Sequence, residues 1–463
     1  MVRIEKDSLG VVDIADDVLY GVQTARAITN FQITGQYANP EFFTSLAKIK
    51  KACALANFEV GDLSQEVCDA ICQSCDEIIA GSYYEYFVTD VIQGGAGTSL
   101  NMNINEIIAN RSAQILGKDL GVYDVVHPND HVNRSQSTND IIPTAGKLTT
   151  YLLGQELIRA INQLSDSFAS KGDEYQSIIK VGRTHLQDAV LISMGQVFHS
   201  YETMLRREVK RIEHALEEML IINLGATAVG TGINSLTGYR EAAVKNLCDI
   251  TGLKFESAED LIDGTKHIDG FAYVHSSLKS LASSLSKMCN DLRLMASGPK
   301  VGISEIILPG KQPGSSIMPG KVNPVIPEVV NQIAFQVIGN DLTVTMAVEA
   351  GQMELNVFEP VLFKNLFESL MILTNACDTL RIHAIDGLIV NKSRIEHLVD
   401  HSLAMATALV KELGYQKVSD ITQEALDTNR SIREIVLEKK LIDEEKLQEL
   451  LRPETMIAPK NRP

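Results

Sequence analysis

The sequence predicts a mainly α-helical protein built around a bundle of long helices. Over several long segments, apolar residues recur at alternating spacings of three and four, which is the pattern of amphipathic helices that pack along their length. Few alternating apolar and polar runs, which would predict strands, lie between these segments. The clearest helical segment is followed by Gly298 and Pro299, a strong signal for a helix end. Together these observations favour a helical bundle over a sheet.

The first part of the chain, up to about Arg134, has a more mixed pattern. Glycine and proline, which favour turns and helix ends, interrupt short helical stretches. The interruptions are Gly10, Gly21, Gly35, Pro40 and the run from Gly94 to Gly97. We therefore expect a smaller, mixed but mostly helical N-terminal domain over residues 1–138.

From Ile142 onward the interruptions become rare and long apolar seams follow. One segment has Leu157, Ile161, Leu164 and Phe168, the next has Val209, Ile212, Leu216 and Met219, and the longest has Leu278, Leu281, Leu285, Met288, Leu292 and Met295. These seams predict a central helical-bundle domain over residues 139–393. Helices with apolar seams on more than one face commonly pack against other subunits, so we expect an oligomer.

After about Asn391 the pattern becomes shorter and more charged. The stretch from Leu441 to Leu451 has the spacing of an amphipathic helix. It predicts a small C-terminal helical domain over residues 394–463.

Composition argues against several classes of partner. Among the 463 residues, 42 lysines and arginines face 59 aspartates and glutamates, and the net charge of −17 argues against nucleic acid or an anionic membrane. No apolar run approaches the ~18 residues of a membrane span, and the first residues lack the apolar core of a signal peptide. The seven cysteines form no pair of CxxC motifs. We therefore expect reduced thiols and a cytoplasmic protein.

Neither a metal nor a cofactor is expected. Cys68, Cys72 and Cys75 fall on one helical stripe, but they offer only three ligands, and packing in the core is the commoner role of such cysteines. His127 and His131 lie four residues apart without an HExxH motif or a nearby pair of cysteines.

Four stretches of small polar residues interrupt the helical pattern and offer hydroxyl, amide and backbone N–H groups to an anion. They are residues 94–103, 131–140, 182–188 and 314–324. Taken singly, such stretches are commonly turns or helix N-caps. The fourth is not a Walker phosphate loop, because Val322 stands where serine or threonine would bind magnesium. The first lacks the glycine spacing of a dinucleotide-binding turn, because Leu100 stands where the third glycine would be.

The donors of these stretches suit carboxylate ligands. An enzyme that removes a proton from the carbon next to a carboxylate must stabilise extra negative charge on that carboxylate, and donors aimed at its oxygens contribute ~3 kcal/mol each. Such an enzyme also needs a base. The fourth stretch combines Ser315 and Lys321 in a glycine-bounded loop.

The fourth stretch, which reads GSSIMPGKVNP from Gly314 to Pro324, resembles the specific signature of the aspartase/fumarase superfamily. The resemblance extends over nearly the whole chain, starting at Arg3. Residues 94–98 read GGAGT and residues 135–140 read SQSTND, where class II fumarases typically have TGSGT and SQSSND. Within the superfamily the chain therefore resembles the aspartase branch.

The resemblance implies a mainly α, three-domain aspartase/fumarase-like fold with a central long five-helix bundle. It also implies a homotetramer in which the bundles form a twenty-helix core and each active site is built from three subunits. The implied reaction is the reversible elimination of ammonia from L-aspartate to give fumarate, through an aci-carboxylate intermediate, without a cofactor.

The motif match also assigns roles to residues. Ser315 is similar to the base that takes the proton from Cβ, and His185 and Lys321 are the other implied catalytic residues. The implied substrate-binding residues are Thr98, Ser99, Ser137, Thr138, Asn139, Thr184, His185, Ser316, Lys321 and Asn323. Among these, Lys321 and Asn323 match ligands of the α-carboxylate, and Thr184 and His185 are contributed by a neighbouring subunit. Glu328 stands where relatives have a carboxylate that pairs with this histidine.

Two alternatives stay open at this point. A fumarase-type hydratase would use the same carboxylate contacts but release water, and a non-catalytic scaffold would use only the stable helical assembly. The sequence also departs from the family pattern at Val410 to Glu412, where relatives typically have a turn with Asn-Pro. Since the C-terminal domain borders the site in relatives, we expect this departure to affect substrate affinity or closure of the loop.

Overall fold

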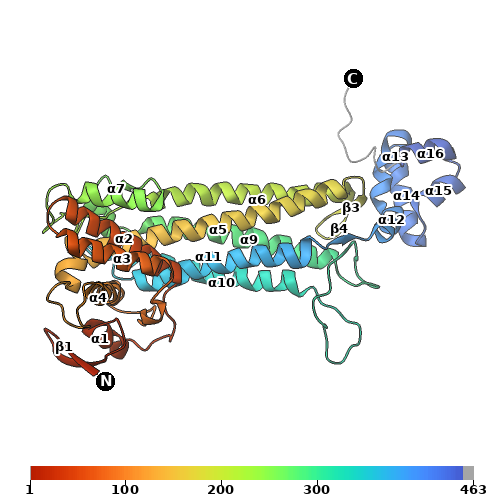
Figure 1. Cartoon of the computed structure of the whole chain (residues 1–463). Helices are drawn as coiled ribbons and strands as arrows, with labels where there is room; N and C mark the ends of the chain where they lie inside the picture. The colour runs from red at the N-terminus through yellow and green to blue at the C-terminus, as the bar shows by residue number, and fades with distance from the viewer. Residues whose placement is uncertain (1, 452–463) are drawn as a thin grey trace. The chain divides into compact units, whose positions relative to one another are not determined.

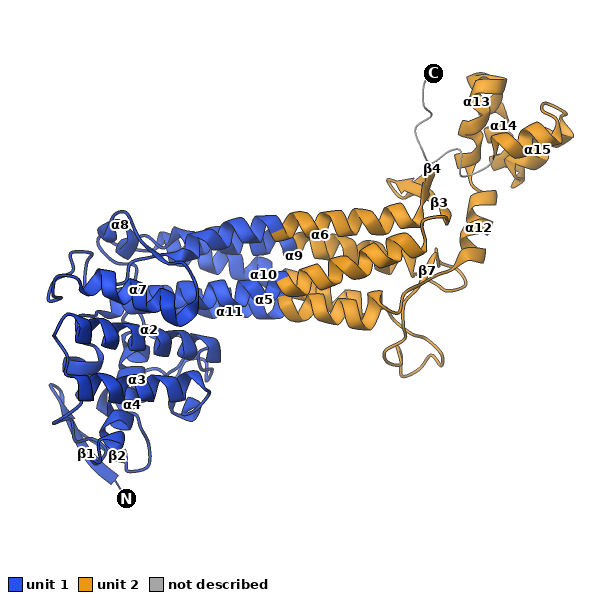
Figure 2. Ribbon diagram, turned by 45° about the horizontal axis from the view of Figure 1, so that its top comes forward, with its two compact units in different colours: residues 1–158, 210–282, 335–373 blue, residues 159–209, 283–334, 374–463 orange. Residues whose placement is uncertain are grey.

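The computed structural model describes residues 2–451, which are mainly helical, as the sequence predicts (Figure 1). Contacts within the chain divide it into two compact units (Figure 2). The first unit consists of residues 1–158, 210–282 and 335–373, and the second of residues 159–209, 283–334 and 374–463. Five long helices contribute a part to each unit: α5 (Thr138–Glu174), α6 (Met194–Glu217), α9 (Asp269–Met295), α10 (Val325–Glu349) and α11 (Glu359–Leu380).

The first unit begins with a β-hairpin and a short helix. The strands β1 (Val2–Asp7) and β2 (Gly10–Ala15) pair antiparallel, and α1 (Val22–Asn30) follows. The buried carboxylate of Glu106 accepts the backbone N–H groups of Gly21, Gln23 and Thr24 at 2.8, 2.8 and 3.1 Å. These contacts satisfy N–H groups that have no partner within a helix, so Glu106 fixes the start of α1.

Three helices follow in the first unit, and the glycines and prolines seen in the sequence mark their ends. They are α2 (Pro40–Glu59), α3 (Gln65–Ile79) and α4 (Thr98–Ile115). Pro40 is the first residue of α2, where its missing N–H costs nothing. Helices α2 and α3 pack against each other, and Cys68 and Cys75 are buried in α3.

The apolar seams predicted from the sequence lie in the long helices and are buried. Leu278, Leu281 and Leu285 of α9 are at most 1% exposed. In the first unit, α9, α10 and α11 also share a polar contact, because His275 Nδ1 lies 3.1 Å from Asp341 Oδ1 and Nε2 lies 3.0 Å from Ser369 Oγ. In the second unit, stretches of α5 and α6 pack through Phe168 and Phe198, whose ring centroids are 6.3 Å apart.

A second hairpin belongs to the second unit. The strands β3 (Ile179–Thr184) and β4 (Gln187–Ser193) pair antiparallel and connect α5 with α6. This hairpin was not expected from the sequence, which indicated only a polar interruption at residues 182–188.

The C-terminal part of the second unit consists of short helices. They are α12 (Lys392–Asp400), α13 (Ala406–Leu413), α14 (Tyr415–Thr428), α15 (Ile432–Glu438) and α16 (Glu444–Leu450). The helix predicted from Leu441 begins only at Glu444, because the side chain of Asp443 accepts the N–H of Lys446 and caps it there. Val410 to Glu412, where the sequence departs from the expected family pattern, lie inside α13.

The remaining elements are short. In the first unit they are the helices η1 (Tyr84–Tyr86), η2 (Pro128–Val132), η3 (Glu218–Leu220), α7 (Tyr239–Thr251) and α8 (Leu261–Lys266) and the paired strands β5 (Ile221–Ile222) and β6 (Glu256–Ser257). In the second unit they are η4 (Arg381–Ile385), η5 (Leu403–Met405) and the paired strands β7 (Ile306–Ile307) and β8 (Ile389–Val390). The three-domain division at residues 138 and 393 stays a prediction. No helix between residues 2 and 451 is long and apolar enough to span a membrane.

Candidate active site

The residues predicted to form the site fall into two groups, one in each unit. The first unit holds Thr98, Ser99, Ser137, Thr138 and Asn139. The second unit holds Thr184, His185, Ser315, Ser316, Lys321, Asn323 and Glu328.

Thr98 is the first residue of α4 and follows a tight glycine turn. Gly95 and Gly97 have φ values of 91° and 83°, a region that glycine reaches without strain. A Cβ atom on Gly97 would also lie only 3.1 Å from Ile142 Cγ2 of α5. The turn leaves Thr98 exposed and Ser99 half-buried at a helix N-terminus, which is favourable for an anion.

Ser137 directly precedes α5, Thr138 and Asn139 are its first two residues, and all three are partly exposed. Asn139 donates its side-chain amide to the carbonyl of Ala228 at 2.7 Å, and Thr138 Oγ1 accepts the side-chain N–H of Asn101 at 3.3 Å. Since Asn101 belongs to α4, the structure brings together the first two polar stretches that the sequence singled out.

Two ionisable residues, Asp140 and Lys50, are buried beneath this part of the site. The carboxylate of Asp140 accepts the N–H groups of Ser137, Gly225 and Thr227 at 2.9, 3.1 and 3.0 Å. Burial nevertheless raises the pKa of Asp140 to about 7, because desolvation opposes the charged form more strongly than these donors and Lys50 favour it. Burial also lowers the pKa of Lys50 to about 8.

Thr184 and His185 lie at the exposed end of the second hairpin. His185 and Leu186 form its two-residue loop and have φ values of 53° and 62°, which matches the turn type that joins two strands most tightly. Positive φ strains residues other than glycine, so the hairpin must be well anchored. The anchor is the buried Glu305, which pairs with Arg183 at 2.7 Å and with Lys180 at 3.1 Å.

Ser315 lies in a loop whose ends are held together. Gly314 donates its N–H to the carbonyl of Lys321 at 2.7 Å, and the side-chain amide of Asn323 donates to the carbonyl of Gly314 at 2.9 Å. Within the loop, Ser315 Oγ accepts the N–H groups of Ile317 and Met318 at 3.2 and 3.1 Å. Two donors aimed at one hydroxyl oxygen stabilise negative charge on that oxygen.

Lys321 is exposed and Asn323 half-buried at the C-terminal side of this loop, and Glu328 lies in the first turn of α10. Among the described residues, Lys321 forms no ion pair within the chain, and none joins His185 to Glu328. The pairing of His185 with Glu328 therefore stays a prediction.

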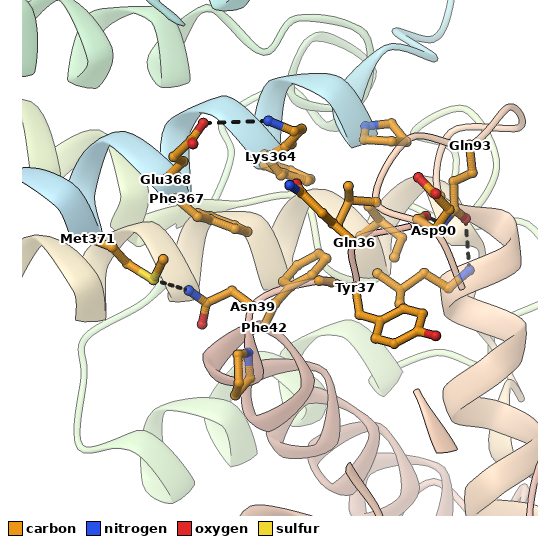
Figure 3. Close-up of a pocket in the computed structure, with 18 residues that line it drawn as sticks. Gln36, Tyr37, Asn39, Phe42, Asp90, Gln93, Lys364, Phe367, Glu368 and Met371 are labelled. Atoms are coloured by element: carbon orange, nitrogen blue, oxygen red, sulfur yellow. Dashed lines mark hydrogen bonds and ion pairs between the residues drawn. The ribbon is translucent and has the colours of Figure 1, made fainter. Parts of the chain in front are cut away.

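A mostly apolar cavity of about 300 Å³ lies in the first unit (Figure 3). Phe42 and Phe367 line it, and the side chains of Lys364 and Glu368 pair at its edge. None of the predicted site residues lines this cavity. Gly97, the residue before Thr98, does line it. The predicted site residues therefore do not belong to this cavity.

No group of three or more histidine, cysteine, aspartate or glutamate side chains within residues 2–451 is arranged to hold a metal ion. Lys50 was not predicted from the sequence, and Asn101 was predicted only as part of the first polar stretch; both lie beneath the hydroxyl groups of the first unit. Lys50 could have been found, because it falls on the same face of α2 as the apolar Leu46, Ile49 and Cys53.

Known proteins are similar to this chain over nearly its whole length. Residues 10–339 match the family described as Lyase, and residues 405–458 match the Fumarase C C-terminus. The chain is 48% identical to an aspartate ammonia-lyase from Bacillus sp and 48% identical to one from Helicobacter pylori, in both cases over 99% of this chain and 98% of the relative. The chain belongs to the aspartase/fumarase superfamily.

Solved structures agree with this membership of the aspartase/fumarase superfamily. The crystal structure of a fumarate lyase:delta crystallin from Brucella melitensis bound to cobalt is 44% identical and has a TM-score of 0.97, covering 99% of this chain and 100% of the other. The resemblance predicted from GSSIMPGKVNP is confirmed, and the chain is a lyase with the helical fold of the superfamily.

Proposed function

We propose that the protein is an aspartate ammonia-lyase, which eliminates ammonia from L-aspartate to give fumarate in a reversible reaction. The observation that carries the proposal is the 48% identity over 99% of the chain to relatives named aspartate ammonia-lyase. The geometry of the Ser315 loop supports it, because this reaction needs a base.

In the proposed reaction, the Ser315 alkoxide takes the proton from Cβ of L-aspartate. The electron pair of the broken C–H bond passes to the β-carboxylate, which becomes the doubly charged aci form. This electron pair then forms the Cα–Cβ double bond as the C–N bond breaks. The amino group leaves as ammonia, which takes the proton from Ser315 and departs as ammonium. The N–H groups of Ile317 and Met318 support the alkoxide.

The β-carboxylate needs donors that bind the aci form more strongly than the ground state. We assign this role to the hydroxyl groups of Thr98, Ser137, Thr138 and Ser316. Each donor contributes ~3 kcal/mol when it is aimed at the developing charge.

The α-carboxylate and the amino group need different partners. Lys321 and Asn323 would bind the α-carboxylate together with Thr184 and His185 of a neighbouring subunit. Asn139 and His185 would lie near the amino group, with Glu328 orienting the histidine. Lys321 suits this role because it is exposed and forms no ion pair among the described residues.

We propose a homotetramer whose subunits share active sites. This proposal is supported by an apolar face of α10 that the single chain leaves uncovered: Phe335, Ile338, Leu342 and Met346 are 64%, 42%, 64% and 63% exposed. Their spacing places them on one side of the helix, and such a patch marks an interface. We also propose a cytoplasmic location, which the seven free thiols support.

The function is tested with purified protein and two substrates. The protein is incubated with L-aspartate and separately with L-malate while the ultraviolet absorbance of fumarate is recorded. We expect fumarate, and an equal amount of ammonia, from L-aspartate. Fumarate from L-malate alone would identify a fumarase-type hydratase, and no fumarate from either would favour a non-catalytic member of the superfamily.

The role of Ser315 is tested by Ser315→Ala. We expect kcat to fall at least ~100-fold, as for other acid-base groups, while the thermal midpoint stays the same because the serine lies in a loop. Gln312→Ala, in an exposed position of the same segment, is the control and should keep wild-type kinetics. A Ser315→Ala protein that keeps more than about a tenth of wild-type kcat would remove Ser315 from the role of base.

A further inference from the structure

A buried chain of polar groups leads from Lys50 to the substrate-binding residue Thr138. Lys50 is 0% exposed, and its ammonium group donates to Asn133 Oδ1 at 3.0 Å and to Gln136 Oε1 at 2.8 Å. Asn133 Oδ1 also accepts the side-chain N–H groups of Asn101 and Asn105 at 3.2 and 3.1 Å. The Nδ2 group of Asn101 in turn donates to Thr138 Oγ1 at 3.3 Å.

The chemistry of the lysine fixes the direction of every bond in this chain. An ammonium group has donors only, so Asn133 must present its oxygen to Lys50. The same Asn133 oxygen faces Asn101, so Asn101 must present the N–H groups of its side chain to it. One of these N–H groups reaches Thr138. The hydroxyl oxygen of Thr138 is therefore an acceptor on its buried side.

This direction matters for the hydroxyl proton. A threonine hydroxyl has one proton to donate, and that proton cannot point at Asn101 Nδ2, which is itself a donor. Among the described residues, no acceptor for the proton is found, and Thr138 is partly exposed. The proton is thus left for an acceptor outside the chain, such as a carboxylate oxygen.

We propose that Asn101 is a positioning residue that, with Lys50 and Asn133 behind it, holds the hydroxyl of Thr138 as a donor toward the substrate carboxylate. The inference rests on the proposed function only in taking a carboxylate as the acceptor. A hydroxyl fixed in this direction before the reaction does not have to reorient when charge develops on the carboxylate.

A double-mutant cycle tests this inference with four proteins: the wild type, Asn101→Leu, Thr138→Val and the double variant. We expect Asn101→Leu and Thr138→Val each to lower kcat/KM for L-aspartate at least tenfold. The double variant should be within about twofold of Thr138→Val alone, because Asn101 has no further route to the substrate. Losses that multiply, or an unchanged kcat/KM in Asn101→Leu, would overturn the inference.

Two further variants separate positioning from structural support. Asn105→Leu removes a partner of the same Asn133 oxygen but makes no contact with Thr138, so its effect should multiply with that of Thr138→Val. Asn101→Asp keeps the size of the side chain but makes it an acceptor, which draws the Thr138 proton inward. If Asn101→Leu does not fold, Asn101→Asp takes its place in the cycle. It should then show the loss of kcat/KM and the non-additivity with Thr138→Val that are expected for Asn101→Leu.

Failure of the proposed function gives a different result. A wild-type protein without activity on L-aspartate contradicts the function, whereas an active wild type with multiplying losses contradicts only the role of Asn101. The cycle can equally be measured with any dicarboxylate that the wild type converts.

Discussion

Lys321 carries the positive charge that the proposed site needs. The protein has a net charge of −17 and repels a dicarboxylate at long range, so a local cation must hold the substrate. In the same unit, Lys180 and Arg183 are both paired with Glu305 and are not available for this role.

We therefore expect Lys321→Met to raise KM for L-aspartate and to lower kcat. The value of kcat/KM should fall at least ~100-fold, which corresponds to about 2.7 kcal/mol of transition-state stabilisation. Lys311→Met, at an exposed position of the same segment, is the matched control and should change kcat/KM less than twofold. A loss of less than fivefold in Lys321→Met would leave the α-carboxylate without its proposed partner.

Asp140 makes stability depend on pH. Its pKa rises from an ordinary value near 4 to about 7 on folding, so the folded protein binds the proton more tightly than the unfolded chain. Between these values the folded state holds more protons at this group, and the contribution of Asp140 to the free energy of unfolding therefore falls as pH rises from about 4 to about 7.

We expect this fall in the midpoint of urea unfolding measured from pH 5 to pH 8. Asp140→Asn should flatten the pH dependence, although it also lowers stability because its amide faces the N–H groups of Gly225 and Thr227. Asp119→Asn, at an exposed position, should keep the wild-type slope. An equal slope in wild type and Asp140→Asn would show that this carboxylate does not titrate in the window.

Which residues the sequence could identify depended on their surroundings. Hydroxyl groups and a lysine in glycine-bounded stretches, such as Thr98 and Lys321, stand out because glycine and small polar residues interrupt the helical pattern there. Lys50 lies in a helix among apolar neighbours, Asn101 lies inside a polar stretch that gives it no distinct role, and the importance of both comes from contacts with residues more than 30 positions away. Such contacts follow from the fold and are not visible in local sequence.

At the level of elements, the loop from Gly314 to Lys321 is closed by contacts that only glycine allows. A Cβ atom at position 314 would lie 2.7 Å from the carbonyl oxygen of Lys321 and 2.9 Å from the backbone nitrogen of Asn323. Both neighbours are backbone atoms and cannot move aside alone. A side chain at this position must open the end of the loop.

Gly314→Ala should therefore displace Ser315. We expect kcat to fall at least tenfold, because displacements of about 1 Å cost up to ~100-fold, while the thermal midpoint changes little. Gly310→Ala is the control, because its Cβ would make only an ordinary contact of 3.4 Å with Val322. Similar kinetics of the two variants would mean that the closed end of the loop is not needed.

The long helices could be predicted from the sequence because their apolar spacing continues for many turns. The hairpin β3–β4 could not, since its turn is formed by His185 and Leu186 and has none of the glycine or asparagine residues that mark such turns. The start of α16 was misplaced because periodicity extends past a helix end, and only the capping contact of Asp443 sets the boundary.

At the scale of the whole molecule, the proposed sharing of sites can be tested by exchange of subunits. Ser315→Ala and His185→Ala should each be inactive alone. In an equal mixture, a site that takes Ser315 from one subunit and His185 from another is intact in one case in four, so about a quarter of wild-type activity should return.

The controls are each variant mixed with itself, and a labelled subunit that confirms the exchange. No recovery after complete exchange would mean that each site takes both residues from one chain. Recovery would show that subunits are in contact, which the uncovered apolar face of α10 also predicts.

The carboxylate of Glu106, seated at the start of α1, has a consequence for selectivity. A helix N-terminus is a general site for carboxylates, and the proposed substrate and product are both dicarboxylates. Because Glu106 belongs to the same chain, it competes as a tethered ligand, whose effective concentration is at least in the millimolar range. The N–H groups of Gly21, Gln23 and Thr24 are thereby occupied by a carboxylate of the chain itself and are not available to a dicarboxylate from solution.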